Sequence, residues 1–503
     1  MFRLQRSVDL DSNATTPVSR RVRKRMGRVL KRHHGNPSAA HGAARAAATI
    51  MQDSREAVAL AVNAEAAEIF FTGSATEANN QVLKVLASRT DPSRKRILST
   101  PIEHPSIMQT LAHLEDTGFE VDYLPIDEDG RVVVERVEAL LDTSTFLVCC
   151  MLANNEIGTI QDVEAISAIA RRHGIPVLSD CVQALGKLPV DVRRLGVDYA
   201  TFSAHKLHGP KGVGALFVRD GASIGPLLHG GHQEAGLRAG TEGVHNIAGF
   251  AEACRALPEL LAASSAVAAR KAELLAALRA HAPALVVHSP AEQSLPNTLS
   301  VRFPGVKNAV LMALLEMHGI AVSAGSACNA AETTPSHVLS AIGLTPEQAE
   351  ETIRISLSSR SSSRDLRYAA GVFADFFAGK APSIPFLRPS QATEAFLFDD
   401  DNYLLDVRFE IERKLLRGLP NSHDASVIGF GRYVHHIPKQ KNVVVICSTG
   451  VDATAIAYAL HKRGYERVCI LLGGVIAWQI QLPKLYKRLG GANITKLAAR
   501  SAR

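Results

Sequence analysis

The sequence predicts an α/β protein with a large domain built on a mostly parallel sheet, a smaller α+β subdomain, and a second, short α/β domain. From about residue 66 to 250, short apolar runs alternate with helical patterns, which is typical of a parallel sheet wrapped by helices. Residues 256–375 contain long Ala/Leu-rich helices and two strand-like segments. A further α/β alternation runs from about 395 to 480, and a chain of 503 residues has room for two or three domains.

Apolar runs mark the strands expected in the large domain, which are 68–72, 96–100, 146–152, 176–179, 199–202 and 214–218 in chain order. The small subdomain is expected to contain helices over 257–282 and strands at 297–303 and 352–357. A proline-rich segment without periodicity follows and predicts a linker. We therefore place a first domain at 1–378 (large part about 15–255, small part about 256–375), a linker at 379–394, a second domain at 395–483 and a basic tail at 484–503.

Composition excludes several classes of protein. The chain has no run of about eighteen uncharged apolar residues, and its first residues lack the apolar core of a secretion signal. We therefore expect a cytoplasmic protein that does not cross a membrane. The seven cysteines are an odd number without metal-like pairs, so neither a disulfide framework, nor a zinc site, nor any other bound metal is expected.

The net charge of +7 comes from the C-terminal part of the chain. Residues 1–394 contain 40 basic and 40 acidic side chains, whereas residues 395–503 contain 16 and 9. Within the balanced first part, residues 19–32 contain eight basic residues and no acidic one, on an expected helix. Both features fit either solvated faces or a surface for RNA or an acidic scaffold protein, so direct binding of nucleic acid stays open.

A lysine and an aspartate occupy positions typical of a pyridoxal phosphate (PLP) site. Lys206 follows an apolar run and has hydroxyl and imidazole neighbours, and its amine can form a Schiff base. Asp180 ends another apolar run 26 residues upstream, where a carboxylate can keep the pyridine nitrogen protonated. Ligands of open α/β sheets gather beyond the carboxyl ends of the strands, and Thr76, His104 and Asn155 follow such ends too. The pattern predicts carbon–heteroatom chemistry on an amino acid.

The segment 71–80 follows an expected strand and opens an expected helix, whose N-terminal N–H groups and dipole favour a phosphate. Ser74 and Glu77 also have the spacing of an ordinary capping box, which would need no ligand. The phosphate interpretation is favoured because further polar residues are expected at the same sheet edge, namely Asp180, Gln183, Ser203, His205 and Lys206. By spacing alone, His104 is either a solvated loop residue or a ring that covers a flat cofactor.

Seven motifs in order resemble those of the PLP-dependent cysteine desulfurases of the class-V aminotransferase family. They span roughly residues 7 to 375 and comprise 11–17 (DSNATTP), 35–38 (GNPS), 74–80 (SATEANN), 154–158 (NNEIG), 203–206 (SAHK), 236–241 (GLRAGT) and 323–328 (SAGSAC). The long loop of small residues around Cys328 is similar to the class I branch, which supplies iron–sulfur scaffolds and tRNA thiolation. The resemblance implies a large domain of PLP fold type I.

Position by position, the resemblance implies how the cofactor would be held. Lys206 would form the internal aldimine, Asp180 would pair with the pyridinium, and His104 would stack on the ring. Gln183 would bond the ring hydroxyl. The phosphate would be held by Ala75, Thr76, Ser203 and His205.

The same resemblance implies how substrate and partner subunit would be held. Thr241 would reach the phosphate of the other subunit, which implies a homodimer. Asn155 and Arg354 would hold the substrate carboxylate, for which a guanidinium offers a fixed two-pronged donor. The thiolate of Cys328 would attack the sulfur of bound L-cysteine, leaving L-alanine and a persulfide for an acceptor protein.

Four short motifs between residues 404 and 478 resemble a single rhodanese domain, in which Cys447 would be the persulfide candidate. Active rhodanese loops carry arginine one or five residues after the cysteine, whereas this chain has Ser448 and Asp452 there. We therefore expect a persulfide relay from Cys328 with little thiosulfate chemistry, or a domain that only docks partners.

The leading hypothesis is a cysteine desulfurase with a rhodanese-like sulfur-accepting domain, which would serve an iron–sulfur scaffold or a tRNA-thiolation enzyme. Two alternatives stay open at this point. Another PLP-dependent lyase or transaminase would make no persulfide. A sulfur-delivery adaptor would still bind its acceptor after loss of Lys206.

Overall fold

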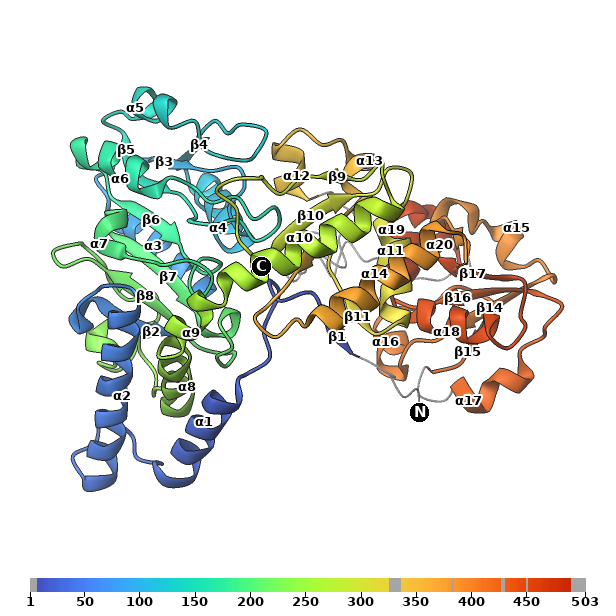
Figure 1. The fold of residues 1–503 in the computed structure, drawn as a ribbon, viewed down its shortest axis with the longest axis horizontal. Coiled ribbons are helices and arrows are strands. Elements are labelled where there is room, and N and C mark those ends of the chain that lie inside the picture. Colours follow the sequence, from blue (N-terminus) through green and yellow to red (C-terminus); the bar gives the residue numbers. More distant parts are fainter. Residues whose placement is uncertain (1–6, 325–335, 381–383, 427–429, 449–450, 490–503) are drawn as a thin grey trace.

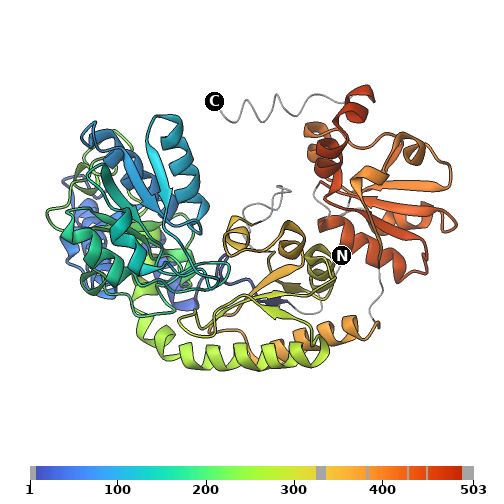
Figure 2. The same cartoon turned by 90° about the horizontal axis from the view of Figure 1, so that it is seen from above.

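The computed structural model describes residues 7–324, 336–380, 384–426, 430–448 and 451–489. Three parts lie in a row, with the large domain at one end, the small subdomain in the middle and the second α/β domain at the other end (Figures 1 and 2). This arrangement confirms the fold class predicted from the sequence.

The large domain is built on a seven-stranded sheet. Its strands lie in the order β2 (Ile69–Thr72), β8 (Gly214–Val218), β7 (Tyr199–Ser203), β6 (Val177–Asp180), β5 (Thr145–Cys149), β3 (Arg96–Ser99) and β4 (Glu120–Tyr123). β8 runs antiparallel to both of its neighbours, and the remaining pairs are parallel. The six expected strands all form, whereas the edge strand β4 was not expected.

Helices cover both faces of this sheet, which explains why its inner strands are apolar without alternation. One core receives side chains from α1 (Arg20–Arg32), α2 (Gly42–Ala61), α5 (Val137–Leu140), α6 (Val163–Arg172), α7 (Val192–Leu195) and α8 (Val244–Cys254). The core on the opposite face is formed with α3 (Ala75–Arg89) and α4 (Pro105–Asp116). The N-termini of α3 and α4 thus follow strands β2 and β3 at the carboxyl edge of the sheet.

The small subdomain contains an antiparallel sheet in the order β12 (Thr352–Ser356), β10 (Thr298–Arg302) and β9 (Val286–Val287). Near the other end of the chain, β1 (Val8–Asp9) pairs in parallel with β11 (Ile320–Ala321), so the N-terminal segment belongs to this core. The helices of the subdomain are α9 (Leu257–Ala262), α10 (Ser264–His281), α11 (Asn308–Met317), α12 (His337–Ala341), α13 (Pro346–Ala349) and α14 (Ser363–Phe377), and α10 and α14 lie side by side (Figure 1).

The second domain is a five-stranded parallel sheet in the order β13 (Phe386–Leu387), β17 (Val468–Leu471), β16 (Asn442–Ile446), β14 (Asn402–Asp406) and β15 (Ser422–Asp424). Its helices are α15 (Glu394–Leu397), α16 (Glu410–Leu415), α17 (Phe430–Tyr433), α18 (Val451–His461), α19 (Gly474–Gln481) and α20 (Pro483–Arg488). β13 lies within the segment expected to be a linker, so the connection is shorter than the predicted 379–394. The backbone of β13 pairs with β17, although two prolines come shortly before this strand in the sequence.

Candidate active site

The carboxyl edge of the large sheet brings together most of the residues singled out from the sequence. Asp180 ends β6, and Lys206 follows β7. His104 and Asn155 follow β3 and β5, respectively. Ala75 and Thr76 open α3, where the first amides of the helix have no carbonyl partner within it.

Asp180 is buried, with 5% of its surface exposed, and is held by two donors. Its Oδ1 accepts from the Val182 amide at 2.9 Å, and its Oδ2 accepts from Asn79 Nδ2 at 3.0 Å. Asn79 is itself fixed, because its Oδ1 accepts from the Thr201 hydroxyl at 2.8 Å and its Nδ2 also lies 2.9 Å from Ser106 Oγ. The carboxylate is thus tied to α3, α4 and β7, as a fixed ring partner would need.

His104 caps the N-terminus of α4, where its Nδ1 accepts from the Ser106 amide at 3.1 Å. Burial lowers the pKa of His104, and the charges of Lys206 and His337 act in the same direction while Asp180 opposes them. The imidazole is therefore neutral near pH 7. A cavity of about 450 Å³ opens beside it and is also lined by Thr76 at the start of α3.

Lys206 reaches the N-terminal segment of the chain. Its Nζ donates to the backbone carbonyls of Asn13 at 2.6 Å and Ala14 at 2.8 Å. The neighbouring His205 hydrogen-bonds with the Thr15 hydroxyl at 3.1 Å. Burial, aided by the charges of Lys206 and Lys211, lowers the pKa of His205 to about 4, so this ring is neutral as well.

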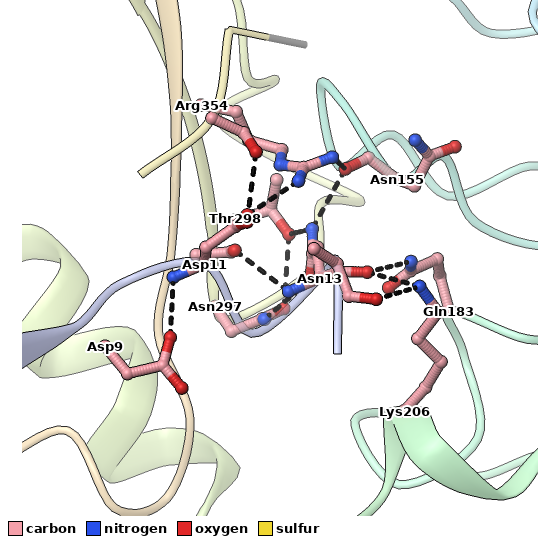
Figure 3. A network of polar contacts seen from close by, with 12 residues as sticks. Asp9, Asp11, Asn13, Asn155, Gln183, Lys206, Asn297, Thr298 and Arg354 are labelled. Atoms are coloured by element: carbon pink, nitrogen blue, oxygen red, sulfur yellow. Dashed lines mark hydrogen bonds and ion pairs between the residues drawn. The ribbon is translucent and has the colours of Figure 1, made fainter. Parts of the chain in front are cut away.

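Asn13 is the centre of the polar network in Figure 3, and sequence reasoning did not assign it a role. Its side-chain Oδ1 accepts from Lys187 Nζ at 2.9 Å and Asn297 Nδ2 at 3.0 Å. Its Nδ2 donates to the Asn155 carbonyl at 3.0 Å and to Thr298 Oγ1 at 2.8 Å. Its backbone carbonyl also receives Gln183 Nε2 at 3.0 Å. One residue thus joins the segments that follow β5, β6 and β7 to the start of β10.

Lys187 is a second lysine in this network. It donates to Asn13 and to Gln183 Oε1, and burial lowers its pKa well below the usual value, with further contributions from the charges of Lys206 and Arg354. Both polar atoms of the Gln183 side chain, Nε2 and Oε1, are therefore hydrogen-bonded.

Arg354 lies on β12 and is 2% exposed. Its Nη2 forms an ion pair with Asp11 Oδ1 at 2.7 Å, and its Nη1 donates to the Asn155 carbonyl at 3.1 Å (Figure 3). Its Nε is buried and has no hydrogen-bond partner among the described residues. The guanidinium therefore still has a donor to offer a ligand.

The remaining predicted residues are placed as follows. Ser203 ends β7 and is buried, and Ser74 caps α3 by accepting from the Glu77 amide at 3.1 Å. The full capping box does not form, because the Glu77 carboxylate accepts from the Gly73 amide at 2.8 Å instead. Thr241 is exposed in the loop between β8 and α8. Cys328 lies outside the described residues.

Glu103 is a buried acid that the sequence did not point to. Its Oε1 accepts from the Met151 amide at 2.7 Å and the Thr100 hydroxyl at 2.8 Å, while its Oε2 has no partner among the described residues. Burial, with a smaller contribution from Asp180, raises the pKa of Glu103 to about 8. The carboxyl is therefore largely protonated at neutral pH.

The second domain buries Cys447 at the end of β16, with 1% of its surface exposed. Its carbonyl accepts from the Val475 amide at 2.9 Å. The next residue, Ser448, donates to Glu412 Oε1 at 2.8 Å. Ser448, one of the two positions at which an arginine is expected in active rhodaneses, is thus bonded to an acidic side chain. The side chain of Asp452 lies outside the described residues.

The donor set fits PLP. An amine at Lys206, a buried carboxylate at Asp180 and unpaired amides at the start of α3 match the aldehyde, the basic ring nitrogen and the phosphate of that cofactor. Among the described residues, no cluster of three or more His, Cys, Asp or Glu side chains could hold a metal, and none of the helices is long and apolar enough to span a membrane.

Comparison with known proteins agrees with this site. A family model described as aminotransferase class-V matches residues 8–368, and the chain belongs to this family, whose members use PLP. A second model, described as a rhodanese-like domain, matches residues 392–481.

Within the family, the chain is similar to proteins named cysteine desulfurase. It is 38% identical over 370 residues to cysteine desulfurase IscS of Dictyoglomus turgidum, which covers 73% of this chain and 94% of that protein. The corresponding protein of Clostridium botulinum is 37% identical over 372 residues, with the same coverage. Among solved structures, one titled NifS-like protein has 40% identity and a TM-score of 0.70, covering 74% of this chain and 100% of that one. A structure titled SspA in complex with cysteine has 34% identity and a TM-score of 0.63, covering 71% and 100%.

Proposed function

We propose that this protein is a PLP-dependent cysteine desulfurase that converts L-cysteine to L-alanine and holds the sulfur as a persulfide on Cys328. The observation that carries the proposal is the link between amine and guanidinium: Lys206 bonds Asn13, and Asn155 joins Asn13 to Arg354. A lysine for the cofactor and an arginine for an amino-acid carboxylate are thereby fixed relative to each other. The relatives named cysteine desulfurase favour this function over another PLP lyase, a transaminase or an adaptor.

Each group of this chain has a defined task. Arg354 binds the substrate carboxylate with the help of Asn155, and its Nε has no hydrogen-bond partner among the described residues. Asp11 bonds the guanidinium at Nη2, so the substrate's carboxylate would bind at donors that Asp11 does not occupy.

The bound cofactor supplies an electron sink for cleavage of the carbon–sulfur bond. Lys206 would hold the cofactor covalently, and its amine lies where it can move a proton. Asp180 keeps the ring nitrogen protonated, Gln183 bonds the ring hydroxyl, and the neutral His104 covers the ring. The residues that hold the phosphate are Ala75, Thr76, Ser203 and His205, with Thr241 contributed by the second subunit of a homodimer.

Sulfur transfer then needs one nucleophile. The thiolate of Cys328 attacks the sulfur of the bound substrate, the carbon–sulfur bond breaks, and its electron pair stays on the carbon side. Protonation of that carbon completes L-alanine, and the sulfur remains on Cys328 as a persulfide. The described residues on either side of the Cys328 segment support this role. Ser323 donates at 3.0 Å to Asp11, which pairs with Arg354. Ser336 donates at 2.5 Å to Glu156, which follows Asn155.

The test is the Cys328→Ser variant. It should keep the cofactor absorbance and the absorbance change on addition of L-cysteine, and it should release no sulfide in the presence of a thiol reductant. Sulfide release at the normal rate would refute the role of Cys328. A colourless protein that binds no PLP would refute the enzyme class.

The sulfur acceptor is a protein of iron–sulfur assembly or tRNA thiolation, and the rhodanese-like domain receives the sulfur first, on Cys447. One contact argues against thiosulfate chemistry: an acidic side chain, Glu412, lies beside Ser448 and would repel small anions. The Cys447→Ala variant should keep the desulfuration rate and lose sulfur relay to an acceptor protein. Unchanged relay would indicate that the domain only docks partners.

A further inference from the structure

Residues 336 and 337 attach the small subdomain to the carboxyl edge of the large sheet. Ser336 is the N-cap of α12, where its Oγ accepts from the Leu339 amide at 3.3 Å. The same hydroxyl donates to Glu156 Oε2 at 2.5 Å. His337 Nε2 donates to the Glu103 carbonyl at 2.8 Å. Two consecutive residues therefore bond the loops that follow β5 and β3.

The site of attachment is close to the groups that recognise substrate. Glu156 follows Asn155, whose carbonyl accepts from both Arg354 and Asn13. The backbone amide of Glu156 donates to Asn154 Oδ1 at 2.8 Å, which fixes the backbone between these two residues. Glu156 is therefore joined directly to the carbonyl group that holds the carboxylate-binding arginine.

The burial of Glu156 would be energetically unfavourable if this residue were only a structural anchor. It is 2% exposed, and its Oε1 is buried without a hydrogen-bond partner among the described residues. An unpaired buried carboxylate oxygen costs free energy, and such groups in folded proteins call for an explanation. A neutral side chain could hold the Ser336 hydroxyl at lower cost.

We propose that Glu156 and Ser336 form an anchor that fixes the C-terminal flank of the Cys328 segment against the substrate-carboxylate site, so that Glu156 is a positioning residue for sulfur transfer. The inference rests on the proposed function, because it assigns the anchor to the step that Cys328 performs. Among the described residues, neither Glu156 nor Ser336 hydrogen-bonds Lys206, Asp180 or Arg354, so cofactor and substrate binding should not depend on the anchor.

The experiment is a double-mutant cycle on the PLP-loaded full chain with Glu156→Ala, Ser336→Ala and the combined variant. The kcat for alanine formation should fall about tenfold in each single variant, which corresponds to the loss of one buried hydrogen bond. The combined variant should be no slower than either, because both substitutions remove the same interaction. The KM for L-cysteine and the cysteine-induced absorbance change should stay within about twofold of the parent.

A matched control exists in the same subdomain. Ser362 caps α14 and donates to Asp365 Oδ2 at 2.6 Å, which is also a serine–carboxylate contact but is made locally within one helix start. Ser362→Ala should leave kcat within about twofold. If Glu156→Ala does not fold, Glu156→Gln still tests the charge and Ser336→Ala still tests the bond.

Three outcomes would overturn the inference: a normal kcat in Ser336→Ala, additive losses in the combined variant, or losses of cofactor binding that parallel the loss of kcat. Failure of the proposed function is distinguishable from these. It would be seen in Cys328→Ser, which would then form alanine and release sulfide normally regardless of how the anchor variants behave.

Discussion

At the scale of one residue, Glu103 is a buried carboxyl group of the site that stays largely protonated at neutral pH. The carboxyl is fully buried, its Oε1 has two donors, and burial raises its pKa from 4.5 to about 8. The folded protein therefore binds a proton that the unfolded chain releases between these values. Stability due to this group is fully present below pH 4.5 and falls as the pH rises towards 8, by about 1.4 kcal/mol per pH unit at most.

The Glu103→Gln variant removes this titration while keeping an acceptor for the Met151 amide and the Thr100 hydroxyl. We predict that the melting temperature of the PLP-loaded parent declines more steeply between pH 5 and 8 than that of the variant, and that the variant is the more stable protein at pH 8. Calorimetric melting across this range measures both. Parallel curves would show that Glu103 is ionised in the folded protein at neutral pH.

Lys206, Asp180 and Arg354 could be singled out from the sequence, through their neighbours or through the family resemblance, and their roles stay predictions. Asn13 and Lys187 could not be assigned a role, because their importance arises from contacts between segments far apart in the chain. Asn13 bonds Asn297, 284 positions away, and no local pattern encodes such a contact. The unpaired atoms of Glu103 and Glu156 are likewise visible only once neighbours are placed.

At the scale of elements, the buried strands were predictable because each is a short apolar run between helices. The edge strand β4 was missed because only one of its four residues is even partly buried, which leaves it without an apolar signal. β13 was missed because it is two residues long and lies in a proline-rich segment, so that its pairing with β17 depends on the rest of the sheet.

The strand β14 ends in the fully buried ion pair of Asp406 with Arg408 in the second domain. Arg408 Nε and Nη2 bond the carboxylate at 2.9 and 2.7 Å, and Nη1 donates to the Leu416 carbonyl at 2.7 Å. Removing one member of a buried pair leaves an uncompensated charge and costs about 3–5 kcal/mol. We predict a loss of this size for Arg408→Ala, confined to this domain.

The chain offers a selective probe for that prediction, because its one tryptophan, Trp478, is buried in α19 of the second domain. Urea unfolding followed by tryptophan fluorescence should shift to lower urea concentration, while unfolding followed by PLP absorbance should not. Equal shifts of both signals would mean that the two domains unfold as one unit.

At the scale of the whole molecule, α18 of the second domain packs against α11 of the small subdomain. The ring of His318 at the end of α11 lies 6.4 Å from that of Tyr458, and Lys462 Nζ lies 4.6 Å from the same tyrosine ring. Burial lowers the pKa of His318, the charge of Lys462 lowers it further, and Asp375 opposes both. No sequence pattern predicted this contact, because it joins surfaces of two separate domains.

We predict that Lys462→Gln raises the pKa of His318, since a nearby positive charge is removed, and that NMR titration of the assigned histidine ring detects the shift. Lys439→Gln is the matched control: this lysine also lies over a tyrosine ring of the second domain, 5.4 Å from that of Tyr465. An unchanged His318 pKa in Lys462→Gln would show that the two domains are not docked in solution.

The central claim is that sulfur leaves L-cysteine for Cys328 at a site organised by Lys206 and Arg354. Its most direct test is intact-peptide mass spectrometry of the PLP-loaded protein after brief exposure to L-cysteine without reductant. We expect that the peptide containing Cys328 gains the mass of one sulfur atom while alanine forms in equal amount, and that Lys206→Ala shows neither change. Alanine formation without added sulfur on the Cys328 peptide would contradict it.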